Sequence, residues 1–231
     1  MVDIISIPGF NDPFSSISHL LGAGFFAILS ALMMRRGQGN LGRMISLALF
    51  CFAAVFLLTI SGVYHLLGSN SNVRAVMRQL DHAAIYVLIA SSFTPIHTIL
   101  FRDWGRTGML VLIWTFAIAA ITIKSIYFDQ ISPSLNLALY LSMGWLGLFS
   151  VISLWRRYGF QFMQSILWGG VAYSVGAVLG SSTWPVLIHG VIQGHEIFHV
   201  AVLIGLGFHW AFIYQIADGH IQVTDTRLSD K

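Results

Sequence analysis

Long apolar runs alternate with short polar segments along the whole chain. Seven runs approach the roughly 20 residues that a helix needs to cross the hydrocarbon core of a bilayer. The polar segments between them are rich in Arg, Ser, Asn and Gly. The pattern predicts helices at about 17–34, 44–67, 81–101, 107–123, 135–154, 163–182 and 195–217. Asp12 and Pro13, just before the first run, are expected to act as turn and cap residues.

These runs use up nearly all of residues 1–231, so we expect one domain. The predicted fold class is all-α, a polytopic integral membrane protein built as a seven-transmembrane-helix bundle. Composition supports this: the chain is 56% hydrophobic and 9% charged, whereas soluble domains carry about 25% charged residues. The single cysteine, Cys51, lies within an apolar run and cannot form an internal disulfide.

The basic residues indicate orientation rather than nucleic-acid binding. The net charge is +3, and the basic residues lie in short segments between apolar runs. One side of the membrane would hold Arg35, Arg36, Arg43, Arg102, Arg106, Arg156, Arg157, Arg227 and Lys231, and the other side Arg74, Arg78 and Lys124. Cytoplasmic loops carry the excess of Lys and Arg. The N-terminus is therefore expected outside and the C-terminus in the cytoplasm, with the chain in a bacterial inner membrane.

Polar residues that do not suit a membrane interior are arranged in pairs. Ser61 and His65 lie four residues apart near the end of the second run, and His195 and His199 lie four apart at the start of the seventh. This spacing places each pair on one helical face. Asp81 opens the third run. All five positions emerge on the same side of the membrane when the passes are counted, and ionisable residues in spans are usually functional.

Three imidazoles that leave a fourth position open are typical of a catalytic zinc site. His65, His195 and His199 are the predicted ligands. Asp81 could accept a proton from a water that the metal activates, and Ser61 could hold that water or a substrate oxygen. Two structural alternatives stay open. Each histidine could instead make an interhelical hydrogen bond, and Asp81 could be the N-cap of its helix.

The remaining polar residues are assigned from their position. His19 and His189 lie on the side of the predicted site, whereas His82 points elsewhere. His97 and His209 lie near the opposite face and are expected to be structural or interfacial. Gly176 and Gly180 form a small-xxx-small pattern that is either a close-packing helix face or simply tolerated.

At these residues the sequence resembles the haemolysin III branch of the progestin and adiponectin receptor (PAQR) family. The resemblance covers nearly the whole chain. It is carried, in order, by Ser15-Ser-Ile-Ser-His19-Leu-Leu-Gly, Ser61-Gly-Val-Tyr-His65, Leu80-Asp-His-Ala-Ala-Ile-Tyr86, Ser92-Phe-Thr-Pro95 and His195-Glu-Ile-Phe-His199. It implies a seven-helix bundle with one Zn²⁺ on His65, His195 and His199, and with Asp81 and Ser61 beside a water. The related adiponectin receptors are understood to have a cytoplasmic N-terminus, which is opposite to the charge pattern here.

Three functions follow from these features. The first, which the resemblance implies, is a zinc-dependent, ceramidase-like hydrolase of lipid amide or ester bonds, with a role in membrane lipid homeostasis and membrane lipids as its partners. The second is a non-catalytic sensor or receptor that zinc stabilises. The third is an intramembrane metalloprotease, because His195-Glu196-Ile-Phe-His199 matches the H-E-x-x-H pattern with Glu196 as base. Glu196 could instead be a first-turn acid that the helix dipole favours. Substrate and protein partners are not specified by the sequence.

Overall fold

The structure, a computed structural model, describes residues 4–68, 72–182 and 184–220. In these ranges it contains the helices α1 (Pro13–Arg36), α2 (Leu41–Leu66), α3 (Asn72–Leu100), α4 (Asp103–Ile126), α5 (Pro133–Trp145), α6 (Gly147–Tyr158), α7 (Phe160–Gly180) and α8 (Gly194–Ile216). Helices α5 and α6 together form one span, Pro133–Tyr158. The described part of the chain therefore has seven helices long and apolar enough to cross a membrane, which confirms the predicted all-α bundle.

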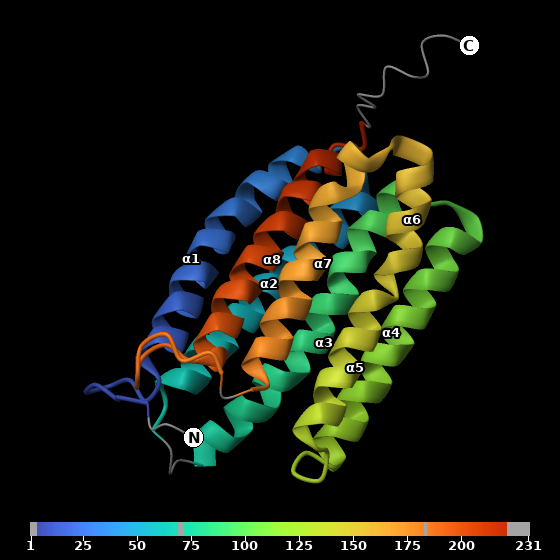
Figure 1. The fold of residues 1–231 in the computed structure, drawn as a ribbon. Coiled ribbons are helices and arrows are strands. Elements are labelled where there is room, and N and C mark those ends of the chain that lie inside the picture. The colour runs from blue at the N-terminus through green and yellow to red at the C-terminus, as the bar shows by residue number, and fades with distance from the viewer. Residues whose placement is uncertain (1–3, 69–71, 183, 221–231) are drawn as a thin grey trace, which may run out of the picture.

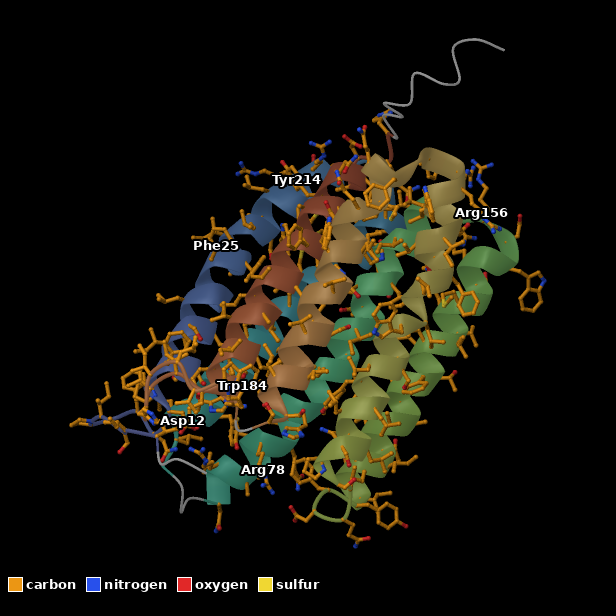
Figure 2. All side chains as sticks on the ribbon, viewed as in Figure 1. Asp12, Phe25, Arg78, Arg156, Trp184 and Tyr214 are labelled. Atoms are coloured by element: carbon orange, nitrogen blue, oxygen red, sulfur yellow. The ribbon has the colours of Figure 1, made fainter. Side chains whose placement is uncertain are left out.

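The helices run alongside one another, with α1 beside α8 on one flank and α4 on the other (Figure 1). The N-terminal segment and the α7–α8 connection lie together at one end of the bundle, where the Ile5 amide donates to the Gly190 carbonyl at 2.8 Å. Figure 2 shows Asp12, Arg78 and Trp184 at this end and Arg156 at the opposite end. Arg78 and Arg156 thus lie at opposite ends of the bundle, as the sequence pattern predicts. Arg227 and Lys231 lie outside the described residues.

Helix α3 begins at Asn72, nine residues earlier than the apolar pattern predicts. The suggestion that Asp81 caps this helix is therefore wrong, because Asp81 lies in the third turn of α3. The first two turns contain Arg74, Arg78 and other polar residues, which a search for apolar runs passes over. They form helix nonetheless, because backbone groups near a membrane still need hydrogen-bond partners.

The fifth span is broken at Leu146, although the apolar pattern predicts one helix over 135–154. The Leu146 amide donates to the Ser142 carbonyl at 3.2 Å, and the Leu146 carbonyl accepts from the Phe149 amide at 3.4 Å, so both backbone polar groups of Leu146 have partners. Pro95, by contrast, lies within the continuous helix α3. A helix break such as the one at Leu146 is tolerated at membrane depth where it is covered by protein or lines a cavity.

Large apolar side chains on the outside of the bundle form its lipid-facing surface. Leu21 and Ile28 on α1 are each 70% exposed, and Phe52 on α2 is 63% exposed. The interior is apolar as well: Leu47 and Phe50 on α2 are fully buried. A protein that is apolar both inside and outside is soluble in lipid rather than in water.

The glycines of α7 allow α8 to approach closely. A Cβ atom at Gly176 would collide with the Ala201 side chain, and one at Gly180 would lie 2.6 Å from Phe198 Cβ. The small-xxx-small pattern is therefore a close-packing face, and its partner is α8. This packing fixes the position of the first two turns of α8, which carry His195 and His199.

Candidate metal centre

Three histidines from two helices converge at the end of the bundle that holds the N-terminal segment. His65 lies in the last turn of α2. His195 and His199 lie on successive turns at the start of α8, so the helical period points both rings in one direction. One ring nitrogen of each histidine lies within 4.8 Å of the other two. The structure therefore brings together the three predicted ligands from positions 130 residues apart in the chain.

The spacing of these nitrogens suits a metal ion. His195 Nε2 lies 3.3 Å from His65 Nε2 and 3.1 Å from His199 Nε2. Nitrogen ligands about 2.0–2.1 Å from a tetrahedral zinc ion are about 3.3 Å apart. The three imidazoles could therefore hold one metal ion with little rearrangement.

The three histidines differ in burial. His65 and His199 are buried, whereas His195 is exposed. A catalytic metal site differs from a structural one in keeping a coordination position open. His195 is the member of the group that solvent can reach.

Asp12 contacts His65 from the side away from the other histidines. Its Oδ2 lies 2.9 Å from His65 Nδ1 and 3.0 Å from Arg74 Nη2. Burial by itself would raise the pKa of Asp12, but hydrogen bonds and charges from His65 and Arg74 hold it below its usual value. Asp12 is therefore an ionised acceptor, and His65 Nδ1 carries the hydrogen. The sequence pattern predicts only a turn or cap role for Asp12, so this contact is one that it misses.

Ser61 and Asp81 lie close to each other and to the histidines. Ser61 is buried one turn before His65, and its hydroxyl is near enough to Asp81 to influence that carboxyl group. The charge of Asp81 is close enough to interact with His65. The three-histidine group does not include Asp81 among its ligand atoms in the described residues. The predicted set of three ligands with a neighbouring carboxylate and hydroxyl thus occupies one region.

His19 packs against the group without being part of it. Its ring centroid lies 4.0 Å from that of His199, and its Nε2 donates to the His199 carbonyl at 3.3 Å. His19 Nδ1 and His199 Nδ1 are buried and have no hydrogen-bond partner among the described residues. His19 therefore supports the second turn of α8 from α1.

Glu196 caps α8. Its Oε2 accepts from the Gln193 amide at 3.0 Å and its Oε1 accepts from the Ser15 hydroxyl at 3.2 Å. Together with the Gln193 side chain this forms a capping box. Both carboxylate oxygens are engaged, which argues against a role as general base and favours the first-turn acid interpretation.

The other histidines lie elsewhere. His82 packs on Phe128, with 5.2 Å between ring centroids, and His189 is exposed in the α7–α8 connection. His97 Nδ1 donates to the Gly105 carbonyl at 2.8 Å, and its Nε2 lies 2.8 Å from the Ser150 hydroxyl. His209 Nε2 donates to the Ile166 carbonyl at 3.3 Å. His97 and His209 thus have the structural contacts expected of them.

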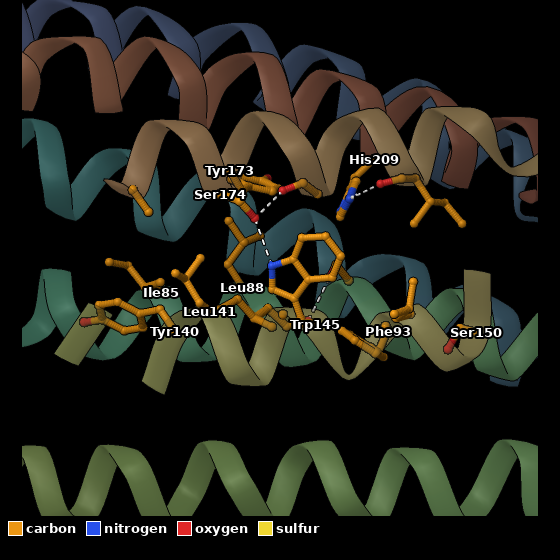
Figure 3. Close-up of a pocket in the computed structure, with 18 of the residues that line it drawn as sticks. Ile85, Leu88, Phe93, Tyr140, Leu141, Trp145, Ser150, Tyr173, Ser174 and His209 are labelled. Atoms are coloured by element: carbon orange, nitrogen blue, oxygen red, sulfur yellow. Dashed lines mark hydrogen bonds between the residues drawn. The ribbon is translucent and has the colours of Figure 1, made fainter. Parts of the chain in front are cut away.

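An apolar cavity of about 160 Å³ begins one helical turn from the histidine group. Its lining includes Leu57, Ile85 and Val202, which are three or four residues from Ser61, Asp81 and His199 respectively. From there it extends between α3, α5, α6, α7 and α8 (Figure 3). The Trp145 indole donates to the Ser174 hydroxyl at 3.1 Å across it. Such a lining favours hydrocarbon over water.

Known proteins resemble this chain over most of its length. A family described as "Haemolysin-III related" matches residues 9–210. "Hemolysin-3" of Bacillus cereus is 28% identical over 83% of this chain and 84% of its own. "Hemolysin-3 homolog" of Bacillus subtilis (strain 168) is 28% identical over 71% of this chain and 77% of its own. "Heptahelical transmembrane protein ADIPOR2" of Oryza sativa subsp. japonica is 30% identical over 71% and 78%, respectively.

Proposed function

This chain belongs to the haemolysin III family, and we propose that it is a zinc-dependent hydrolase that cleaves an amide or ester bond of a membrane lipid. The observation that carries the proposal is the apolar cavity one turn from a three-histidine group. A lipid chain in this cavity would place its polar linkage near the histidines, at the end of the bundle where lipid headgroups begin.

His65, His195 and His199 would hold the metal, and zinc suits three imidazoles in a hydrolytic site. When bound, the ion would supply Lewis-acid activation of a water and of the scissile carbonyl. Asp81 accepts the proton of the attacking water and then delivers it to the leaving amine or alcohol. The Ser61 hydroxyl, which lies near Asp81, orients that water. A new bond joins the water oxygen to the acyl carbon, the bond to nitrogen or oxygen breaks, and a fatty acid leaves.

The test measures metal content and lipid cleavage together. Wild type, purified without chelators, is expected to contain about one zinc per chain and to release fatty acid from an acyl-labelled amide or ester lipid. Asp81→Asn is expected to keep the metal and lose turnover, because an amide cannot accept the proton. Asp129→Asn is the matched control, since this carboxylate is 83% exposed and pairs with Arg78 instead. Turnover retained in Asp81→Asn with metal bound would contradict the assigned role.

A second candidate is a sensor or receptor that the metal stabilises without turnover. It is favoured by the placement of the ligands, which join the end of α2 to the start of α8. A metal bridging two helices contributes to folding whether or not catalysis occurs. This function predicts one metal per chain, a loss of thermal stability on chelation, and no cleavage of amide or ester lipids by the metal-loaded wild type.

We further propose that the N-terminus and the histidine group face the outside and that the C-terminus faces the cytoplasm. In the described residues the basic side chains away from the histidines are Arg35, Arg36, Arg43, Arg102, Arg106, Arg156 and Arg157, against Arg74, Arg78 and Lys124 at the histidine end. This imbalance supports the orientation by the positive-inside rule. The test is cysteine labelling from outside the cell, with the exposed positions His189→Cys and Gln38→Cys compared in a Cys51→Ala background. Labelling of Gln38→Cys alone would reverse the orientation.

A further inference from the structure

Asp12 occupies the N-cap position of α1 but does not cap it. An aspartate at this position usually accepts a hydrogen bond from a backbone amide of the first turn. Here the side chain makes no such bond. Its Oδ2 instead faces His65 Nδ1 and Arg74 Nη2, and its Oδ1 accepts from the Asn11 side chain at 2.9 Å. The helix forgoes a capping bond while the carboxylate binds a histidine 53 residues away.

The backbone holds this carboxylate at a fixed distance from the histidine. The Asp12 amide donates to the His65 carbonyl at 2.9 Å, and the Asn11 amide donates to the Leu66 carbonyl at 3.2 Å. The N-terminal segment therefore pairs with the last turn of α2. Arg74 supports the arrangement from α3: it donates to the Leu67 carbonyl as well as to Asp12, and its guanidinium lies 4.8 Å from the Tyr64 ring centroid.

The consequence for His65 is chemical. A neutral imidazole carries hydrogen on one nitrogen only. Asp12 Oδ2 already accepts from Arg74, so it is the acceptor toward His65 as well; the hydrogen is therefore on Nδ1 and the lone pair is on Nε2. Nε2 is the atom that faces His195 Nε2 at 3.3 Å. The Asp12 contact thus selects the tautomer and the ring orientation that metal binding needs.

We propose that Asp12 is a positioning residue that orients His65 for metal binding, and that Arg74 holds Asp12 in place. Groups that act on a metal ligand in this way are commonly worth about 10- to 100-fold in metal affinity. The inference rests on the metal-binding part of the proposed function and is independent of lipid hydrolysis. Through Asp12, the N-terminal segment would affect metal affinity although it contributes none of the three ligands.

The experiment measures zinc affinity of the full-length protein in detergent by competition with a chromophoric chelator. Asp12→Ala is expected to weaken binding about 10- to 100-fold. Asp12→Asn is expected to recover most of that loss, because its amide oxygen can still accept from His65 Nδ1. Asp129→Ala, an exposed carboxylate at the same end of the bundle, is expected to bind zinc as wild type does.

Thermal unfolding of the metal-free proteins separates positioning from a merely structural role. If Asp12 acts on the ligand, zinc affinity falls by more than any loss of metal-free stability accounts for. Zinc affinity within twofold of wild type in folded Asp12→Ala would overturn the inference, as would Asp12→Asn binding as weakly as Asp12→Ala. If Asp12→Ala does not fold, the zinc affinity of Asp12→Asn is the test instead, and a loss of zinc affinity greater than tenfold in that variant rejects the inference. Absence of zinc in wild type would reject the metal site itself, which is a distinguishable result.

Discussion

A methyl group added to α7, well away from the ligand atoms, should weaken the metal site. In Gly180→Ala the new Cβ would lie 2.6 Å from Phe198 Cβ and 3.0 Å from its Cγ. Carbon atoms in contact prefer about 3.5–4.0 Å, so the helices must separate by about 1 Å. Phe198 lies between His195 and His199 in sequence, on the same turns of α8. The shift would therefore move two ligands together relative to His65.

That displacement exceeds what a metal site tolerates, since ligand distances must be held to about 0.2 Å. We expect at least a tenfold loss of zinc affinity, together with about 1–3 kcal/mol of destabilisation from overpacking. The assay is zinc competition with a chelator, accompanied by thermal unfolding. Gly170→Ala is the control on the same helix, because a Cβ atom there meets no atom within 4 Å. Equal zinc affinity in the two variants would refute the reasoning that α7–α8 packing positions the ligands.

Two further predictions concern Glu196 and the cavity. Glu196→Gln should keep lipid turnover within a few-fold of wild type, since an amide can retain the cap. Loss of turnover with zinc still bound would instead support Glu196 as the general base that a protease requires. Glu196→Ala should lower stability by about 1 kcal/mol through loss of the cap, measured by thermal unfolding. Val202→Trp should fill the cavity near His199 and, at unchanged zinc content, reduce the cleavage of long-chain lipids more than that of short-chain lipids. An equal reduction for both chain lengths would show that the cavity does not bind the lipid chain.

The candidate ligands could be predicted from sequence because their signal is local. Two residues four apart on a helix share a face wherever the helix lies, and this holds for Ser61 with His65 and for His195 with His199. Counting passes through the membrane then places both pairs at one end. The start of α3 could not be predicted in this way, because a run of apolar residues marks only the part of a helix that crosses the membrane. The apolar pattern therefore misses the polar first two turns of α3 and gives Asp81 a possible role as N-cap.

What the sequence determined by itself is the class of the molecule and the end of the bundle that the three candidate ligands share, because hydropathy and helical period are properties of neighbouring residues. Only the tertiary structure decided which groups surround those histidines. The contact of Asp12 with His65, the hydrogen bond from Ser15 to Glu196 and the cavity beside Val202 each join separate helices or a helix and a distant segment. Such contacts depend on how helices are positioned against one another, and here that is set by packing such as that of Gly180 on Phe198.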